Sequence, residues 1–172
     1  MDLFEAINGR YSYRGAYTDA PVPQADLEKM LAAGVAAPSG HNFQTPVFAA
    51  ITDTDKCAKI AEILPGPNTA TAKAYIVVLS HEKFTEHNMQ FELQDFAAAT
   101  ENILLAVHAL GYATVWIEGR LFVNDVRGQL HTMLNAPADY TVRALLPLGV
   151  AAEEVKHPPK QAYEERVKFN SF

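Results

Sequence analysis

The longest helical pattern in the sequence constrains the fold more than any other feature. Between residues 88 and 110, apolar side chains recur every three or four positions, and Gly111 follows where a helix C-cap is expected. The stripe consists of Phe96, Ala99 or Thr100, Ile103, Leu104, Val107 and Leu110. A helix of that length is about twice the usual one. We therefore expect it to form the spine of the core, an oligomer interface, or both.

Shorter patterns surround this helix. The continuous apolar run at residues 74–79 is typical of a strand that is buried on both faces. Helices are also predicted at residues 24–36, 55–64 and 123–134, strands at 47–51, 114–117 and 141–150, and a turn at 65–68. The order lacks a regular βαβ rhythm, and no linker divides the chain. We predict one α+β domain over residues 1–172, with a three-layer arrangement.

Composition excludes several classes of protein. Fourteen Lys and Arg residues against twenty Asp and Glu residues give a net charge of −6, which argues against a nucleic-acid-binding surface. The single cysteine, Cys57, excludes an internal disulfide, and no apolar run approaches the roughly 20 residues that span a bilayer. The N-terminus does not resemble a signal peptide. A cytoplasmic protein without a membrane partner is expected.

Standard catalytic motifs are missing from the sequence. It contains no GxGxxG, no GxxxxGK[ST], no GxSxG and no HExxH, and the six histidines show no metal-ligand spacing. We therefore predict neither a metal site nor a catalytic side chain of a known acid–base or nucleophilic constellation.

One cationic segment stands out against the acidic background. In Arg10-Tyr11-Ser12-Tyr13-Arg14, the two arginines and Ser12 alternate, so an extended backbone projects all three to one side. Two guanidiniums with a hydroxyl between them suit a phosphate group. Taken by itself, the segment is more simply explained as an exposed basic loop that pairs with surface carboxylates.

Three further segments carry polar groups at ends of predicted elements. The loop at residues 37–46 (APSGHNFQTP) follows a helix, residues 116–120 (WIEGR) end a predicted strand, and residues 156–160 (KHPPK) form a second cationic cluster. Such positions are usual for ligand contacts. An ordinary turn and ordinary surface chemistry explain them as well, if each is taken alone.

Together and in this order, the segments resemble the nitroreductase family of FMN-dependent oxidoreductases. The opening INGRYSYRGAYTDAPVPQADLEKMLAAGVAAPSGHNFQTPVF is similar to the family's N-terminal pattern. DFAAATENILLAVHALGYATVWIEG is similar to its central helix and next strand, and LLPLGVAAEEVKHPPK to its last strand and basic tail. The resemblance covers most of the chain and is weakest over residues 52–72 and 120–138. It implies a dimeric fold with a mostly antiparallel central sheet flanked by helices.

The resemblance also implies roles for individual residues. Arg10 and Ser12 would hold the FMN phosphate beside Tyr11, together with Lys160, where the family usually has arginine. Arg14 would lie near N1 and the C2 carbonyl of the flavin. The remaining implied contacts are Pro38, Ser39 and Asn42 along the ring and ribityl chain, and Glu118 and Gly119 along the ring, with a backbone N–H reaching N5. The cofactor would lie at a homodimer interface.

These implications lead to one main functional hypothesis. The protein is expected to take hydride from NAD(P)H onto FMN and to pass electrons to a nitroaromatic, a quinone or a similar acceptor. Hydride transfer by a flavin needs no side-chain acid or base. The alternatives are a non-catalytic flavin-binding or sensing protein, and a structural α+β domain that binds no flavin.

Overall fold

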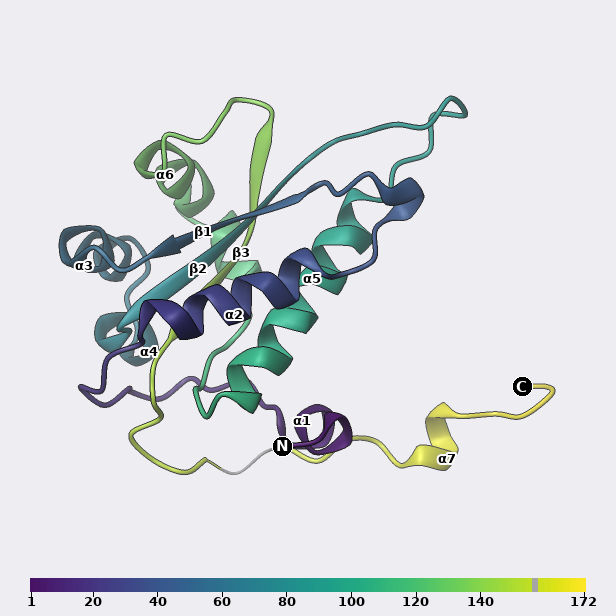
Figure 1. Cartoon of the computed structure of the whole chain (residues 1–172), viewed down its shortest axis with the longest axis horizontal. Coiled ribbons are helices and arrows are strands. Elements are labelled where there is room, and N and C mark those ends of the chain that lie inside the picture. Colours follow the sequence, from purple (N-terminus) through teal and green to yellow (C-terminus); the bar gives the residue numbers. More distant parts are fainter. Residues whose placement is uncertain (156–157) are drawn as a thin grey trace.

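A three-stranded antiparallel sheet forms the centre of the computed structural model, which describes residues 1–155 and 158–172 (Figure 1). Its strands are β1 (Pro46–Ile51), β2 (Ala74–His81) and β3 (Tyr140–Leu148), in the order β1-β2-β3. Val78 lies opposite Ala144 and Leu79 opposite Val142, so Arg143 is the additional residue of a β-bulge. The predicted central antiparallel sheet is confirmed.

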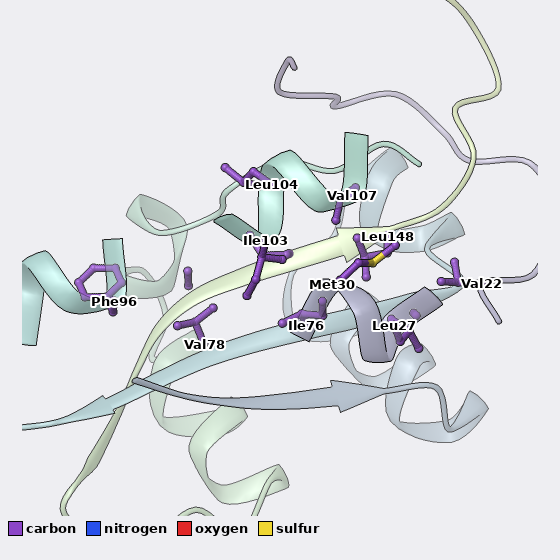
Figure 2. Packing of buried hydrophobic residues seen from close by; sticks show 13 residues of the cluster. Val22, Leu27, Met30, Ile76, Val78, Phe96, Ile103, Leu104, Val107 and Leu148 are labelled. Carbon is purple, nitrogen blue, oxygen red and sulfur yellow. The ribbon is translucent and has the colours of Figure 1, made fainter. Parts of the chain in front are cut away.

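Helices cover both faces of the sheet. α2 (Gln24–Val35) and α5 (Glu92–Ala109) lie on one face, and α3 (Thr54–Ile63) and α6 (Val126–Met133) lie on the other (Figure 1). Figure 2 shows the first cluster, in which Met30, Ile76 and Ile103 are fully buried between α2, the sheet and α5. Every β2 residue from Ala74 to Ser80 is buried because both faces are covered. The three-layer α+β prediction is thus confirmed.

The central helix α5 begins later than the sequence pattern predicts. Residues 85–89 form a turn in which the Thr85 hydroxyl accepts the Met89 N–H (3.1 Å) and Asn88 has a left-handed φ of 58°. That conformation cannot continue a right-handed helix, so α5 starts at Glu92 rather than at Asn88. α6 is shortened for the same reason, because Asn124 and Asp125 have φ values of 51° and 53°.

The predicted strand at residues 114–117 is wrong. This segment makes single bridges instead of a ladder: Thr114 pairs with Ser12 and Ile117 pairs with Leu145. The segment therefore pairs with the N-terminal segment at one residue and with β3 at another, and it forms a continuous ladder with neither. β3 also ends at Leu148, two residues before the predicted end.

Four short helices were not predicted. α4 (Pro67–Thr71) occupies part of the predicted turn and has Pro67 in its first turn, where the missing N–H costs nothing. The others are η1 (Gly40–Asn42), η2 (Gly119–Phe122) and α7 (Tyr163–Arg166). Each is too short to show a helical period in the sequence.

Both ends of the chain expose apolar side chains. α1 (Leu3–Gly9) is closed by a capping box between Asp2 and Glu5, yet Leu3 and Phe4 are 64% and 72% exposed. The segment around α7 extends away from the body of the molecule (Figure 1), and Phe169 is 77% exposed. None of the described helices has the length and apolar character needed to cross a membrane.

Candidate functional site

A cavity of about 300 Å³ gathers the predicted phosphate-binding residues. Its lining consists of Asn8, Arg10, Tyr11, Ser12, Arg14, Val155, Pro158 and Lys160. Three of these side chains are cationic, and among the described lining residues none is acidic, although the chain carries a net charge of −6. Lys160 comes from the C-terminal segment, so the tail and the N-terminal segment meet here. The cluster's charge suits a phosphate group.

The predicted alternation is present over residues 12–14, where Tyr13 is completely buried, whereas Tyr11 lines the cavity together with Arg10 and Ser12. The Tyr13 N–H donates to the Thr114 carbonyl (2.8 Å), and its hydroxyl donates to the Ala16 carbonyl (2.5 Å). With Tyr13 fixed inward, Ser12 and Arg14 on either side of it are exposed. The ring of Tyr11 packs edge-on against that of Tyr13, at 6.2 Å between centroids.

A second buried tyrosine fixes the backbone behind this segment. The Tyr17 hydroxyl donates to the Pro147 carbonyl (2.9 Å), and the Tyr17 N–H donates to the Thr71 hydroxyl (2.8 Å). Burial raises the pKa of Tyr17 far above its ordinary value, with smaller contributions from neighbouring tyrosines, Tyr13 first. The hydroxyl is therefore protonated and able to donate this hydrogen bond at neutral pH.

The two arginines of the cavity have different partners. Arg10 forms an ion pair with Glu101 of α5, at 3.0 Å between its Nε and the carboxylate. Arg14 is exposed and donates from Nη1 to the Ser12 carbonyl (3.3 Å). Arg14 also lines a second, adjoining cavity, so the two cavities share it.

The second cavity, of about 430 Å³, contains Glu118 and Gly119. Its lining consists of Arg14, Gly66, Pro67, Asn68, Val115, Trp116, Ile117, Glu118, Gly119 and Arg120. The Trp116 indole N–H donates to the Glu118 carboxylate (3.1 Å), which ties that carboxylate to the cavity wall. A Cβ added at Gly119 would meet no atom within 4 Å. The backbone is therefore open to a flat ligand at this point.

Asn68 lines this cavity but was not predicted, and Arg120 was predicted only as part of the segment 116–120. Asn68 is only 6% exposed, and Arg120 donates from Nη2 to the Pro65 carbonyl (2.7 Å). That bond joins η2 to the loop before α4 and so connects two walls of the cavity. The Gly-Pro-Asn sequence is the one feature that could have indicated Asn68, because a short amide after a tight turn is a common ligand contact.

The predicted loop residues lie elsewhere in the subunit. Pro38 and Ser39 line a third cavity of about 110 Å³ between α2, β1 and α5, and Asn42 is exposed on η1 beside it. Among the described residues, none lines both this cavity and either of the other two. Asp95 contacts the loop, whereas Tyr11 packs against His108 at the other end of α5. These helix positions are 13 residues apart (108 − 95), which is about 20 Å along the axis.

Two predictions remain, the cationic cluster of the tail and the lack of a metal site. Lys156 and His157 of the predicted tail cluster lie outside the described residues, so Lys160 alone represents that cluster here. In the described part of the chain, no group of three His, Cys, Asp or Glu side chains is placed to hold a metal ion.

Comparison with known proteins identifies the class. The family described as the nitroreductase family matches residues 7–70 and 64–150. A protein of Archaeoglobus fulgidus named "Putative NADH dehydrogenase/NAD(P)H nitroreductase" is 33% identical over 171 residues, which is 98% of this chain and 94% of that protein. The chain belongs to the nitroreductase family, and the predicted family resemblance is confirmed.

Solved structures agree with this assignment. A Bacteroides fragilis nitroreductase with bound FMN has a TM-score of 0.79 and 25% identity, covering 99% of this chain and 100% of that one. A Desulfovibrio desulfuricans protein in complex with FMN has a TM-score of 0.81 and 29% identity, covering 100% of this chain and 98% of that one. The fold is therefore the nitroreductase fold over nearly the whole length.

Proposed function

We propose that the protein is an FMN-dependent oxidoreductase that takes hydride from NAD(P)H and reduces a nitroaromatic, a quinone or a similar acceptor. Family membership and the FMN-bound structures of similar proteins support the enzyme class and the cofactor. The observation that carries the proposal for this chain is the pair of adjoining cavities, one cationic and one open beside Gly119, that share Arg14.

The cationic cavity fits the phosphate end of FMN. Arg10, Arg14 and Lys160 supply positive charge, and Ser12 supplies a hydroxyl between the arginines. The ion pair between Arg10 and Glu101 holds the Arg10 side chain against α5. A dianionic phosphate would gain charge-assisted hydrogen bonds here. Riboflavin, which lacks the phosphate, would gain none of them.

The second cavity fits the ring end. When bound, FMN supplies the chemistry by accepting hydride and passing electrons on. The chain's part is positional and electrostatic. Arg14 places a positive charge where the two cavities meet, and the first N–H groups of η2, at Gly119 and Arg120, have no partner within that helix. Asn68 adds an amide on the opposite wall.

We further propose that the working unit is a homodimer with the flavin at the interface, formed by a single domain over residues 1–172. Pro38 and Ser39 line a cavity that shares no described residue with the other two, which supports a contact of their loop, Asn42 included, with the flavin of the partner subunit. The exposed Leu3, Phe4 and Phe169 supply apolar surface for such an interface. A cytoplasmic location stays a prediction.

A fluorescence titration tests cofactor binding directly. Trp116 is the only tryptophan and lines the proposed ring cavity, so FMN should quench its emission by contact and by energy transfer. Anaerobic NADH or NADPH should then bleach the bound flavin, and acceptors added afterwards should restore its colour. Quenching without bleaching by either nucleotide would indicate a flavin-binding protein that is not this enzyme. A protein that does not respond to FMN would refute the proposal.

A further inference from the structure

Asp95 of α5 is a buried carboxylate whose hydrogen bonds all go to one loop. The side chain is 2% exposed, its Oδ1 accepts the Gly40 N–H (2.8 Å), and its Oδ2 accepts the Thr45 hydroxyl (2.9 Å). Thr45 is itself completely buried. One carboxylate thus joins both ends of residues 40–45 to the first turn of α5, where the helix dipole also favours a negative charge.

The backbone between these two bonds is in an unusual conformation. His41, Asn42 and Gln44 have φ values of 52°, 54° and 51°, in the left-handed region that non-glycine residues seldom occupy. Such conformations persist only where the surrounding structure determines them, and they cluster at functional sites. The Gln44 N–H also donates to the Ser39 hydroxyl (3.0 Å), which closes the loop on itself.

Packing gives a second reason for the loop's shape. A Cβ added at Gly40 would lie 2.3 Å from the Phe91 ring, so only glycine allows this approach. The His41 ring stacks on Phe91, with 5.6 Å between centroids and 17° between planes. The loop is therefore held by the two hydrogen bonds that it donates to Asp95 and by aromatic contact with Phe91, the residue just before α5.

We propose that Asp95 is a positioning residue that acts in trans: it holds residues 39–45 of its own subunit in the shape that completes the flavin site of the partner subunit. This inference rests on the proposed function. It adds that the geometry of Ser39 and Asn42 depends on a carboxylate that touches neither the flavin nor the acceptor. Because the loop's own cavity shares no described lining residue with the other two cavities, a defect at Asp95 should appear in the partner's site.

The first test measures the loop in the protein without FMN. D95A removes both acceptors and should speed hydrogen exchange of the Gly40 amide about tenfold or more, because a buried bond to a charged group is lost. D95N keeps an acceptor for Gly40 and should largely preserve protection. T45V removes only the Thr45 bond and leaves the Gly40 acceptor in place, so its readout is exchange of the neighbouring Gln44 amide, which should speed up. Unchanged Gly40 exchange in D95A, or unchanged Gln44 exchange in T45V if D95A folds poorly, would overturn the proposal.

E92Q serves as the matched control. Glu92 is a second buried carboxylate, one helical turn before Asp95, but its partners are Arg143 (2.6 and 2.9 Å) and Ser80, none of which is in the loop. E92Q should lower the melting temperature while leaving Gly40 protection in the folded protein unchanged. D95A should instead have its larger effect on Gly40 protection and its smaller effect on the melting temperature. If both variants lose loop protection in proportion to stability, Asp95 has only a general structural role.

The second test measures function. D95A should weaken FMN binding and raise the KM for the acceptor about tenfold, with a smaller change in kcat, and D95N should recover most of the loss. Faster Gly40 exchange with unchanged FMN affinity and KM would overturn the positioning role. Failure of wild-type protein to bind FMN would instead refute the proposed function, and the exchange result would still decide the loop's dependence on Asp95.

The third test separates action in trans from action in cis. Differently tagged R10A and D95A chains are combined, and the heterodimer is purified. If the loop of one subunit serves the partner's site, both defects fall in one site and the other is intact, so half of the wild-type sites bind FMN tightly. If each loop serves its own subunit, both sites carry a defect and no tight site remains. That outcome, or a monomeric wild-type protein, would overturn action in trans.

Discussion

The phosphate half and the loop half of the proposed site differ in what brings their residues together. Arg10, Ser12 and Arg14 are adjacent in an extended segment, and Lys160 joins them in one cavity of one subunit. Pro38 and Ser39 are equally close in sequence, yet they line a separate cavity beside α5. Local backbone geometry therefore assembles the first half. In the proposed homodimer, the second half would join a flavin site only through the partner subunit.

The largest expected effect tests the phosphate half alone. Arg10→Ala should weaken FMN binding about tenfold to a hundredfold, because charge-assisted hydrogen bonds contribute about 1.5–3 kcal/mol each. Riboflavin affinity should stay nearly unchanged, since riboflavin has no phosphate. Both affinities can be measured by quenching of Trp116 fluorescence. Equal losses for the two ligands would place Arg10 away from the phosphate and remove the contrast between the halves.

The same contrast explains what could be predicted from the sequence. The outward side of Ser12 and Arg14 follows from alternation, and the existence of the core helices follows from their period, so both were predicted correctly. Residues 114–117 look like a strand because they are apolar, but their backbone bonds are divided between Ser12 and Leu145. Period alone cannot show that division, because it depends on which segments lie on either side.

Residues that act through tertiary contacts could not be predicted. Asn68 and Arg120 come from segments about 50 residues apart, and the local sequence of neither shows that the two segments meet in one cavity. Asp95 looks like any acidic residue near a helix N-terminus. Its particular role depends on Gly40 and Thr45, which are 55 and 50 residues away. Helix starts were also missed where Asn88, Asn124 or Asp125 has a left-handed backbone.

The second prediction concerns Arg14, which lines both the proposed phosphate cavity and the proposed ring cavity. Two unit charges about 4 Å apart at an effective dielectric near 20 interact by about 4 kcal/mol. Solvent access at the exposed Arg14 should leave about 1–2 kcal/mol of preference for reduced, anionic flavin. Since about 30 mV corresponds to 1.4 kcal/mol for two electrons, Arg14→Gln should lower the midpoint potential by a few tens of millivolts.

Oxidised flavin provides the control for Arg14. The oxidised ring is neutral, so Arg14→Gln should change the affinity for oxidised FMN only slightly. The affinity for reduced FMN should fall much more, and this difference is what lowers the midpoint potential. The measurement is a spectroscopic redox titration of the FMN-loaded variant. An unchanged midpoint in a folded, loaded variant would place the guanidinium away from the flavin N1.

The third prediction addresses the tyrosine that supports the phosphate half. Tyr17→Phe removes the bond to the Pro147 carbonyl and should lower the free energy of unfolding by about 0.5–1.5 kcal/mol. The folded-state pKa of Tyr17 is raised, so wild-type stability is fully present below about pH 10 and falls as the unfolded tyrosine ionises above it. Denaturant unfolding between pH 8 and 11 should therefore show a shallower alkaline loss in the variant. Identical slopes would contradict the burial of this hydroxyl.

The smallest effect is expected at Lys160, the one contribution of the tail to the phosphate half. Lys160 is exposed, and an exposed point charge is well hydrated and screened by salt, so Lys160→Ala should weaken FMN binding only about twofold to fivefold. The loss should shrink further as salt is raised.

Deleting the chain from residue 156 onward removes the same charge together with Tyr163, Phe169 and Phe172, which expose apolar surface. If the tail also holds a partner subunit, the deletion should produce monomers in sedimentation and lose far more FMN affinity than Lys160→Ala. Equal losses from the two changes, with the dimer intact, would show that the tail contributes only the charge of Lys160 and would leave α1 as the apolar surface of the proposed interface.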